Sequence, residues 1–448
     1  MKGTDIPYTY NVITFGCQMN EYDSEVLAGI LEGMGFTPAV DPELAGVIMI
    51  NTCCVRETAE NKVFSLLGRL RLLKQKRPEL IIGISGCMSQ QEGMAAKLRH
   101  NFPHVDLILG TGDAYRLPEL LENALNGRSA QVSVGRNPNS IIENLPVKRT
   151  AGVRAWVPIM YGCDNFCTYC IVPYVRGRER SRLPEDVLRE INTLAESGFK
   201  EVVLLGQNVN SYGKDLPHEA GFAGLLRKIE TEAPGINRVR YMTSHPRDFS
   251  PGLVDAVASL SKVCEHFHLP VQSGSNRILK EMGRGYSREE YLALAELIRT
   301  RIPEATITTD IMVGFPGEEE DDFKDTLELV KEVEFDSAYT FIYNIRPGAP
   351  ASSMPGQIRP GVKKRRIQEL LARQNRISLA KNQREVGREQ EILAEGESKR
   401  GAGLLAGRNR GNKTVVFAGG PELIGRTVKV RVTKSHLANL EGEICNEQ

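Results

Sequence analysis

The sequence of 448 residues lacks both long apolar runs and a strong net charge, which is only +1. No stretch approaches the roughly 20 apolar residues that cross a bilayer, and MKGTDIPYTY holds no apolar segment before a small-residue cleavage site. A G-x-x-x-x-G-K-[ST] loop is also missing, so an NTPase has no support. The content of 41% hydrophobic and 25% charged residues is that of a globular protein of two to four domains. We expect it to be cytoplasmic.

Nine cysteines are present, an odd number that fits a disulfide framework poorly. A reducing compartment disfavours such a framework further. Metal binding or redox chemistry is the better expectation for these cysteines.

The small net charge hides an asymmetry along the chain. From Gly361 to the end, 18 Lys and Arg stand against 10 Asp and Glu, and the rest has 39 against 46. A basic tail on an acidic body suggests an appended module that binds a polyanion. The competing interpretation is a solvated basic helix, KKRRIQELLARQNR, without a partner.

Residues 1–130 alternate apolar β-rich runs with amphipathic helical patterns, which predicts an open parallel αβα domain. The expected strands are YNVITFGC, GVIMINTCC, LIIGISGC and VDLILG; the expected helices are SEVLAGILEGMG, AENKVFSLLGRLRLLKQ, EGMAAKLRHNF and LPELLENAL. Three of these strands end in cysteine, at Cys17, at Cys53 with Cys54 beside it, and at Cys87. Ligands of open α/β sheets bind outside the carboxyl ends of the strands, so these cysteines should converge. Buried cysteines that only pack are the alternative.

A polar stretch, VGRNPNSIIENLPVKRTAG, predicts a linker, after which residues 149–375 form about six strand-plus-helix units. The expected strands are VRAWVPIMYGC, EVVLLGQNV, RVRYMTSH, EHFHLPVQS, ATITTDIMVGFPG and SAYTFIYNIRPG. Six units are too few for a closed eight-stranded barrel, so we expect a partial (β/α)6 barrel. Loops after the strands carry the chemistry in such barrels, and GQN, SHP, QSGS and GFPG lie there.

Residues 378–445 change character to short β-like runs separated by glycines, which predicts a small β-barrel. Five of its basic residues are candidates for contacts with RNA: Lys399, Arg400, Arg408, Lys413 and Arg426. Small barrels often hold RNA through a basic face. The alternative is a structural barrel whose basic residues pack against another domain.

GCDNFCTYC places Cys163, Cys167 and Cys170 in a C-x3-C-x2-C loop directly after a predicted barrel strand. Three thiolates can hold three irons of a four-iron cubane and leave the fourth iron open to a reacting molecule. A structural zinc site normally needs four ligands, and the next histidine is His218. Iron–sulfur chemistry is therefore favoured over zinc or inert thiols.

This loop, with an aromatic Tyr169 before its last cysteine, resembles that of the radical S-adenosylmethionine enzymes. With TFGCQMN, NTCCVRE and ISGC upstream and the basic β-tail downstream, the whole chain resembles the methylthiotransferase family. FCTYCIVPYVRGRERSR and YMTSHP are most similar to its members that make 2-methylthio-N6-isopentenyladenosine in tRNA. The tail then corresponds to a TRAM-like domain.

The resemblance implies two [4Fe–4S] clusters and S-adenosylmethionine as cofactors. Cys163, Cys167 and Cys170 would hold the cluster that cleaves S-adenosylmethionine to a 5′-deoxyadenosyl radical, which takes hydrogen from C2 of the adenine. Cys17, Cys53 and Cys87 would hold an auxiliary cluster that delivers sulfur. Residues expected to form the cofactor pocket are Tyr169, Gly206, Gln207, Asn208, Ser244, His245, Gln272, Ser273, Gly274, Ser275 and the GFPG loop from Gly314 to Gly317. Cys54 should point to the opposite face from Cys53 and pack, a ligand exchange between them being the minor alternative.

The implied partners are a tRNA anticodon stem-loop, an electron donor of flavodoxin or ferredoxin type and proteins that supply sulfur or iron–sulfur clusters. We expect a monomer. A methylthiotransferase acting on threonylcarbamoyladenosine in tRNA or on an aspartate of a ribosomal protein would keep the same chemistry. A non-catalytic iron–sulfur protein that binds RNA and senses redox state is an alternative of another class.

Two weaker features leave alternatives open. His266 and His268 face one side of a strand, where packed histidines are commoner than ligands. The arginines of GRERSR, from Arg178 to Arg182, either contact a phosphate or cofactor carboxylate or form a solvated turn.

Overall fold

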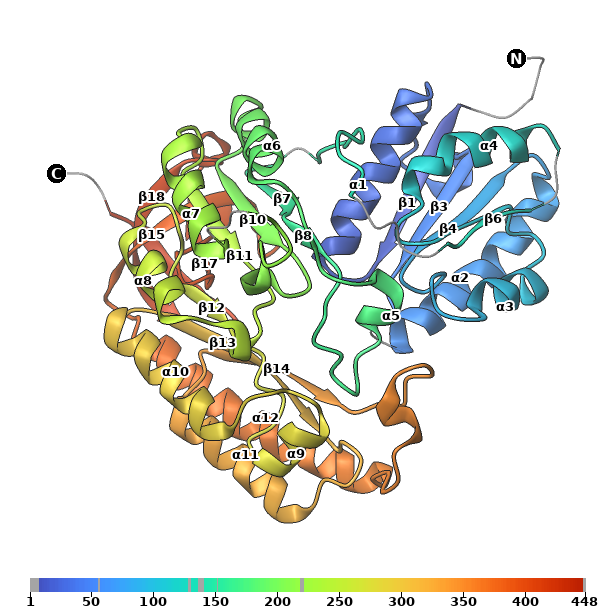
Figure 1. Cartoon of the computed structure of the whole chain (residues 1–448). Coiled ribbons are helices and arrows are strands. Elements are labelled where there is room, and N and C mark those ends of the chain that lie inside the picture. Colours follow the sequence, from blue (N-terminus) through green and yellow to red (C-terminus); the bar gives the residue numbers. More distant parts are fainter. Residues whose placement is uncertain are drawn as a thin grey trace.

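The computed structural model describes residues 8–54, 57–127, 130–135, 141–150, 152–217 and 221–445. Three units follow one another along the chain: an αβα sheet, a partial barrel and a small closed β-barrel (Figure 1). The predicted α/β architecture is confirmed. Within these ranges, no helix is long and apolar enough to span a membrane.

The N-terminal unit is a six-stranded parallel sheet in the order β2-β1-β3-β4-β5-β6. Its strands are β1 (Thr9–Phe15), β2 (Thr37–Pro38), β3 (Val47–Thr52), β4 (Ile81–Gly86), β5 (Leu107–Leu109) and β6 (Gln131–Ser133). The four predicted strands form its centre. The short strands β2 and β6 close its two edges and had no apolar run long enough to predict them.

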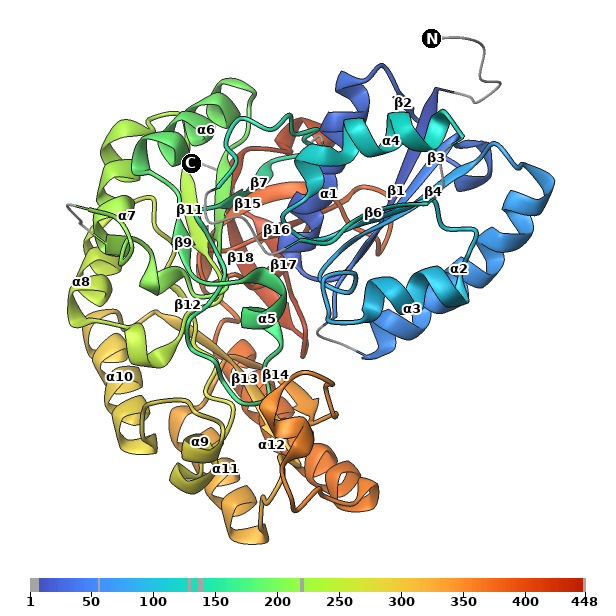
Figure 2. The ribbon, with the colours of Figure 1, turned by 45° about the vertical axis from the view of Figure 1, so that its right-hand side comes forward.

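Two helices cover each face of this sheet, as Figure 2 shows. The helices α1 (Gln18–Gly33) and α4 (Leu117–Leu125) pack on one face, and α2 (Glu57–Lys76) and α3 (Met94–Asn101) on the other. Alternation along β3 directs Val47 and Met49 to the first pair and Ile48 and Ile50 to the second. A strand buried on both faces reads as a continuous apolar run, which is why this sheet was predictable.

The six predicted strands of the second unit are all present. They form two parallel three-stranded sheets, β7-β10-β11 and β12-β13-β14, joined by a bridge between Val239 and Val263. The strands are β7 (Arg154–Pro158), β10 (Glu201–Leu205), β11 (Arg238–Tyr241), β12 (His266–His268), β13 (Thr306–Val313) and β14 (Ser337–Ile342). The main outer helices are α6 (Pro184–Glu196), α7 (Gly221–Glu232), α8 (Pro251–Ser259), α10 (Arg288–Arg301), α11 (Glu320–Val333) and α12 (Pro360–Gln383). A two-stranded antiparallel pair, β8 (Met160–Tyr161) with β9 (Arg180–Ser181), follows β7.

The basic helix α12 is part of the barrel unit and not a free solvated helix. Arg366 is buried and its guanidinium pairs with Glu318 at 2.7 Å. Leu370 joins the barrel core, and the amide of Gln374 donates to the carbonyl of Phe335 at 2.8 Å. The helix runs unbroken through residues 376 and 377, between the ranges expected for the second and third domains.

The third unit is a closed five-stranded barrel in the order β15-β16-β17-β19-β18. Its strands are β15 (Glu389–Glu397), β16 (Leu404–Arg408), β17 (Thr414–Ala418), β18 (Thr427–Ser435) and β19 (Leu440–Ile444). Their inward side chains build a separate core around Leu405, Val415 and Phe417. The β-like runs EQEILAEG, NKTVVFAG and GRTVKVRVTKSH correspond to β15, β17 and β18, whereas the apolar residues of β16 and β19 are interrupted by Gly407 and Gly442 and gave no such run.

The small barrel docks on the amino-terminal ends of the large barrel's strands through the turn 408–413. The guanidinium of Arg240 in β11 donates to the carbonyls of Asn409 (2.6 Å) and Arg410 (2.7 Å). Arg410 pairs in turn with Glu265, just before β12, at 2.7 Å. Lys413 pairs with Asp336, just before β14, at 3.1 Å. The opposite ends of the large barrel's strands remain for the loops that carry the predicted site.

Candidate functional site

Cys17, Cys53 and Cys87, which we call the auxiliary site, follow three adjacent parallel strands. Phe15 of β1 pairs with Thr52 of β3, and Thr52 pairs with Gly86 of β4. Cys53 and Cys87 come directly after these paired residues, and Cys17 follows Phe15 by two positions. The three cysteines therefore end at one edge of the sheet, as predicted.

Two glycines let the strand ends approach each other closely. A Cβ on Gly16 would lie 2.8 Å from the Cβ of Cys53, and a Cβ on Gly86 would lie 2.4 Å from the carbonyl oxygen of Thr52. Gly86 also has a φ of 105°, which disfavours side chains. The glycine before Cys17 and the glycine before Cys87 thus set the spacing of the auxiliary site.

A buried pair of asparagines supports this edge. The Asn20 amide donates to the Asn51 side-chain oxygen at 3.1 Å, and the Asn51 amide donates to the Asn20 carbonyl at 2.8 Å. Ser24 accepts a second bond from Asn51 at 2.9 Å. We did not predict this network; the asparagines of TFGCQMN and MINTC were the available signal.

Cys163, Cys167 and Cys170, which we call the loop site, occupy the turn that follows β8. Its backbone is held by bonds from the amide of Cys163 to the carbonyl of Gly177 (3.1 Å) and from the amide of Thr168 to the carbonyl of Met282 (3.0 Å). Phe166 sits in the left-handed region at a φ of 46°. Strained backbone held by its surroundings is characteristic of functional loops.

The environment of the thiols fits metal ligands. Burial raises the pKa of Cys163 to about 11 and that of Cys170 to about 12. Thiols with such a high pKa stay protonated at pH 7 unless a cation displaces the proton from sulfur, as iron would do on binding. A cubane binds each thiolate through a different iron, so its ligands need not surround one point. Among the residues described, no group of three His, Cys, Asp or Glu side chains is positioned to hold a single metal ion.

Each cysteine site also has a buried arginine in contact with one thiol. The Nε–H of Arg176, at the end of α5 (Val172–Arg176), donates to the Cys87 sulfur at 3.3 Å. An Nη–H of Arg284 donates to the Cys167 sulfur at 3.4 Å. A guanidinium beside sulfur favours an anionic ligand set. Sequence patterns did not indicate either residue, because arginine is usually solvent-exposed.

The helix α5 connects the two cysteine sites. It begins two residues after Cys170 and ends at Arg176, which reaches Cys87. Val175 packs in the core of the N-terminal sheet, and its carbonyl accepts a bond from the Thr111 hydroxyl at 2.7 Å. The segment after the loop site therefore docks on the domain that carries the auxiliary site (Figure 1).

Of the expected pocket residues, those after β10 and β11 interlock. The Gln207 side-chain oxygen accepts a bond from the amide of Gly162, one residue before Cys163, at 2.5 Å. The Asn208 oxygen accepts from the amide of His245 at 3.1 Å. The Ser244 hydroxyl and the His245 Nε2 atom are buried without a hydrogen-bond partner among the residues described. At this end of the barrel, these two unpaired atoms are candidates for hydrogen bonds to a ligand.

The neighbouring ring of Tyr286 lies 5.7 Å from the His245 ring, and Tyr169 receives a 3.3 Å bond from Arg284. Gly206 is in close contact with Met160. These residues therefore gather with the loop site at one end of the barrel. Their contacts with a cofactor stay predictions.

The QSGS and GFPG loops are fixed by α11 and the residues before it. The amide of Gly274 donates to the Thr326 hydroxyl at 2.9 Å, and the hydroxyl of Ser273 lies 3.4 Å from the same oxygen. The amide of Gly314 donates to Glu318 at 2.7 Å. Gln272 has a φ of 70°, a strained value for a non-glycine residue. The backbone of both loops is thus rigid beside the site.

The candidate RNA contacts divide into two groups. Lys399 and Arg426 are exposed, and Arg400 is 44% exposed while pairing with Glu441. Arg408 pairs with Glu395 at 2.6 Å, and Lys413, 13% exposed, pairs with Asp336. The second group lies at the docking turn. Lys413 thus pairs with another domain, and contacts of the exposed Lys399, Arg400 and Arg426 with RNA stay predictions.

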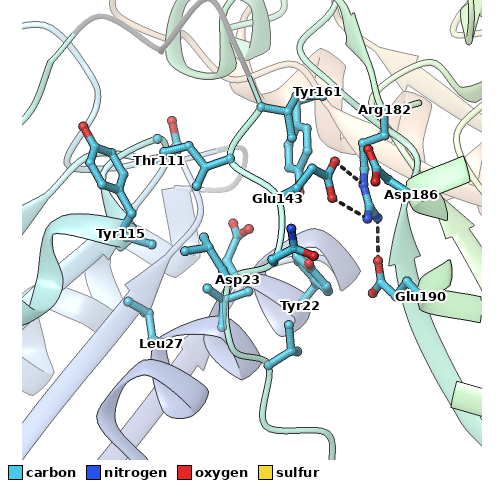
Figure 3. A pocket seen from close by; sticks show the side chains of 18 of the residues that line it. Tyr22, Asp23, Leu27, Thr111, Tyr115, Glu143, Tyr161, Arg182, Asp186 and Glu190 are labelled. Carbon is cyan, nitrogen blue, oxygen red and sulfur yellow. Dashed lines mark hydrogen bonds and ion pairs between the residues drawn. The ribbon is translucent and has the colours of Figure 1, made fainter. Parts of the chain in front are cut away.

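A cavity of about 460 Å³ separates α1, the segment 141–149 and α6 (Figure 3). Asp23 and Arg176 line it on the side of the auxiliary site. Its opposite wall holds Arg182, whose guanidinium pairs with Glu143 at 2.7 Å and Glu190 at 2.5 Å. Arg182 of GRERSR therefore joins the linker to the barrel, whereas Arg178 of the same segment is 72% exposed and pairs with Asp164 at 2.8 Å.

Cys54 and the two strand histidines are packed. Cys54 is fully buried in the α2–α3 core, and its hydrogen bond to Cys87, with the charge of Arg176, lowers the pKa of Cys87. His266 and His268 are buried and both contact the Thr308 hydroxyl, at 3.0 and 3.1 Å. Burial lowers the pKa of His266 to about 3. They are core histidines, as favoured from the sequence.

Known families match all three units. Residues 157–330 match the radical SAM superfamily, residues 9–110 the uncharacterized protein family UPF0004 and residues 383–445 the TRAM domain. The chain is 62% identical to the tRNA-2-methylthio-N(6)-dimethylallyladenosine synthase of Pelotomaculum thermopropionicum, over 97% of each chain. The chain belongs to this synthase family. The enzymes of the same name from Desulforamulus reducens and Carboxydothermus hydrogenoformans are 57% and 56% identical, each over 97% of this chain and over 95% and 98% of their own.

Solved structures resemble the synthase fold at low identity. The radical S-adenosylmethionine methyltransferase TsrM from Kitasatospora setae has a TM-score of 0.58 at 15% identity, covering 77% of each chain. The cobalamin-dependent radical enzyme OxsB has a TM-score of 0.52 at 12% identity, covering 83% of this chain and 56% of its own. Both likenesses support the radical SAM fold and carry no further argument.

Proposed function

We propose that this chain is a tRNA methylthiotransferase that converts N6-(dimethylallyl)adenosine at position 37 to its 2-methylthio derivative. Family membership supports the reaction, and one observation carries the assignment of the site. Arg176, six residues after Cys170 of the loop site, donates to Cys87 of the auxiliary site at 3.3 Å. A radical formed at one site and sulfur held at the other must act on one substrate atom, so the two sites need to be this closely connected.

The cofactors are an iron–sulfur cluster and S-adenosylmethionine, as for radical SAM enzymes in general. We infer two clusters, because the chain has two separate sets of three cysteines. When bound, these groups supply the radical and the sulfur, chemistry that ordinary side chains cannot provide. Each set leaves one iron of a cubane without a thiolate, which gives S-adenosylmethionine a place at the loop site.

The side chains around the loop site bind and orient the cofactor. Tyr169 would contact its adenine, and the unpaired Ser244 hydroxyl and His245 Nε2 atom would bond to its polar groups. Burial, followed by the charge of Arg284, lowers the pKa of His245 to about 2, so His245 stays neutral at pH 7. Its Nδ1 accepts a bond from the Arg247 amide at 3.3 Å, which leaves the proton on Nε2. His245 is therefore a hydrogen-bond donor at this position.

The anticodon stem-loop of tRNA is the proposed macromolecular partner. An adenine in that loop can leave its stack, which lets it enter a buried site. Of the five candidate cations, Lys399, Arg400 and Arg426 are the ones that face solvent and can contact the RNA backbone. We further propose a cytoplasmic monomer with domains 1–130, 149–375 and 378–445, served by a flavodoxin- or ferredoxin-type electron donor and by sulfur or iron–sulfur supply proteins.

Nucleoside mass spectrometry of tRNA tests the substrate. A strain without this protein should accumulate N6-(dimethylallyl)adenosine and lose the methylthio form, and the wild-type gene should restore it. Unchanged tRNA would refute the proposal. Loss of methylthio-threonylcarbamoyladenosine, or of methylthio-aspartate in a ribosomal protein, would instead assign one of the related activities.

Release of 5′-deoxyadenosine separates an enzyme from a redox sensor. Reconstituted protein given dithionite and S-adenosylmethionine should release it, and Cys167→Ala should not. Cys264→Ala is the matched control, because Cys264 is 1% exposed but lies at the other end of the barrel, next to β12. No release from wild-type protein that holds about eight irons per chain would favour the sensor.

A further inference from the structure

At each cysteine site a buried arginine donates a hydrogen bond to one sulfur, but only one of these two arginines has a carboxylate as counter-ion among the residues described. Arg176 donates to Cys87 at 3.3 Å, and Arg284 donates to Cys167 at 3.4 Å. Arg176 is 5% exposed and Arg284 is 4% exposed, so neither charge is screened by much water. Each guanidinium therefore acts directly on the sulfur that it contacts.

At the auxiliary site a carboxylate offsets this charge. An Nη atom of Arg176 lies 2.6 Å from an oxygen of Asp23, which lines the cavity of Figure 3. At the loop site, the part of the chain that the structure describes offers Arg284 no carboxylate partner. The other acceptors of Arg284 are the hydroxyls of Tyr286 (3.1 Å) and Tyr169 (3.3 Å) and the carbonyl of Pro270 (2.5 Å).

All three guanidinium nitrogens of Arg284 are thus engaged by protein groups. Its Nε bonds to Tyr286, one Nη to Cys167 and Tyr169, and the other Nη to Pro270. Each nitrogen already has a protein partner, so none is left free to bind the carboxylate of a bound molecule. The side chain is arranged as a fixed positive charge beside Cys167, and we treat it as a positioning residue.

Reduction of a cluster adds one electron, supplied by a one-electron donor, and so adds one negative charge beside the sulfur ligands. A buried positive charge and a hydrogen bond to sulfur both stabilise the reduced form and raise the reduction potential. We propose that Arg284 raises the potential of the loop-site cluster with its full charge, whereas Asp23 cancels the charge of Arg176 at the auxiliary site and leaves only its hydrogen bond to Cys87. This inference rests on the proposed function, because it requires a cluster at each cysteine set.

Full-length chains that hold one cluster each allow the two potentials to be measured separately. Cys17, Cys53 and Cys87 are replaced by alanine to observe the loop-site cluster, and Cys163, Cys167 and Cys170 to observe the auxiliary cluster. Iron content and the electron paramagnetic resonance signal of the reduced cluster are recorded against the applied potential. Each reading is independent of methylthio product formation.

At the loop site, Arg284→Gln removes the charge. At the wild-type midpoint, the ratio of reduced to oxidised cluster should fall about tenfold, which is about 59 mV for a one-electron couple. Arg284→Lys retains the charge and should keep most of the ratio. If Gln and Lys change it equally, or neither changes it, the assignment to Arg284 is wrong.

At the auxiliary site, the sign should reverse. Asp23→Asn releases the charge of Arg176, so the reduced-to-oxidised ratio should rise about tenfold at the wild-type midpoint. Adding Arg176→Gln to Asp23→Asn removes both charges and should return the ratio toward the wild-type value. An unchanged or lower ratio in Asp23→Asn would overturn the role of Asp23. Absence of a cluster from either wild-type triplet would instead refute the proposed function.

Discussion

Replacing Arg240 by methionine should destabilise the large barrel more than any surface ion-pair substitution. The Arg240 Nε atom lies 2.8 Å from an oxygen of Glu201, with the two side chains 2% and 0% exposed. The second Glu201 oxygen is buried and has no hydrogen-bond partner in the described chain. Without Arg240, the Glu201 carboxylate would stay buried and lose its ion-pair partner.

The expected cost follows from this burial. Removing one partner of a buried ion pair costs about 3–5 kcal/mol of the free energy of unfolding. Arg240→Met also removes the donors to the carbonyls of Asn409 and Arg410, so the upper half of that range applies. For a unit of about 200 residues, each kcal/mol lowers the melting temperature by about 2–4 °C, giving a decrease on the order of 10 °C.

Differential scanning calorimetry of anaerobically reconstituted protein with equal iron content measures this decrease. Arg240→Met/Glu201→Leu removes both charges and should recover most of the stability, because apolar replacements of a buried pair are often neutral. Arg189→Ala is the surface control: its guanidinium is 61% exposed and pairs with Asp186 within α6, worth about 0.5 kcal/mol or less. A decrease in Arg240→Met no larger than in Arg189→Ala, or no recovery in the double variant, would refute the reasoning.

Three further predictions concern the site and the RNA surface. The double variant Lys399→Ala/Arg426→Ala should weaken tRNA binding and reduce the dependence of the binding constant on salt concentration by about two charges. Lys413→Ala should lower the melting temperature and leave that salt dependence unchanged. Binding titrations at several salt concentrations check both expectations. Cys54→Ala should leave the iron content of both sites unchanged because Cys54 packs in the core, and a loss of about four irons would show that it is a ligand. Gly16→Ala should reduce the iron content by about half, since its Cβ would collide with Cys53, and full iron content would contradict that role of the glycine.

The central strands of the N-terminal sheet, the six strands of the large barrel and the placement of the two cysteine triplets after strands could be predicted from the sequence because they depend on local patterns. Apolar runs define the strands, and parallel strands end at one edge, which brings Cys17, Cys53 and Cys87 together. The sequence predicted the start of α1 six residues too late. The expected helix begins at Ser24, where the apolar pattern becomes regular, but α1 begins at Gln18, with Cys17 as its N-cap.

The buried arginines could not be predicted in the same way. Each of them bonds to at least one group that is 14 or more residues away in the sequence, as Arg176, Arg240 and Arg284 show. A single sequence does not show which distant groups surround a charged side chain. The same limit applies to the basic residues of the small barrel. Composition indicated a basic domain. Only the structure shows that Lys413, in the docking turn, pairs with Asp336, whereas Lys399 is exposed.

The two ends of the large barrel have different roles, and buried arginines contribute to both. At the amino-terminal end of its strands, Arg240 and Arg410 pair with glutamates and fix the small barrel in place. At the carboxyl-terminal end, Arg284 has no carboxylate partner among the residues described, and it contacts the sulfur of Cys167 instead. An arginine that is paired with a carboxylate contributes packing and hydrogen bonds, whereas an arginine without such a partner also contributes the electric field of its charge. On the proposal above, Arg284 acts on the loop site because it lacks a carboxylate partner in the described part of the chain, whereas Arg240 and Arg410, each paired with a glutamate, hold the two barrels together.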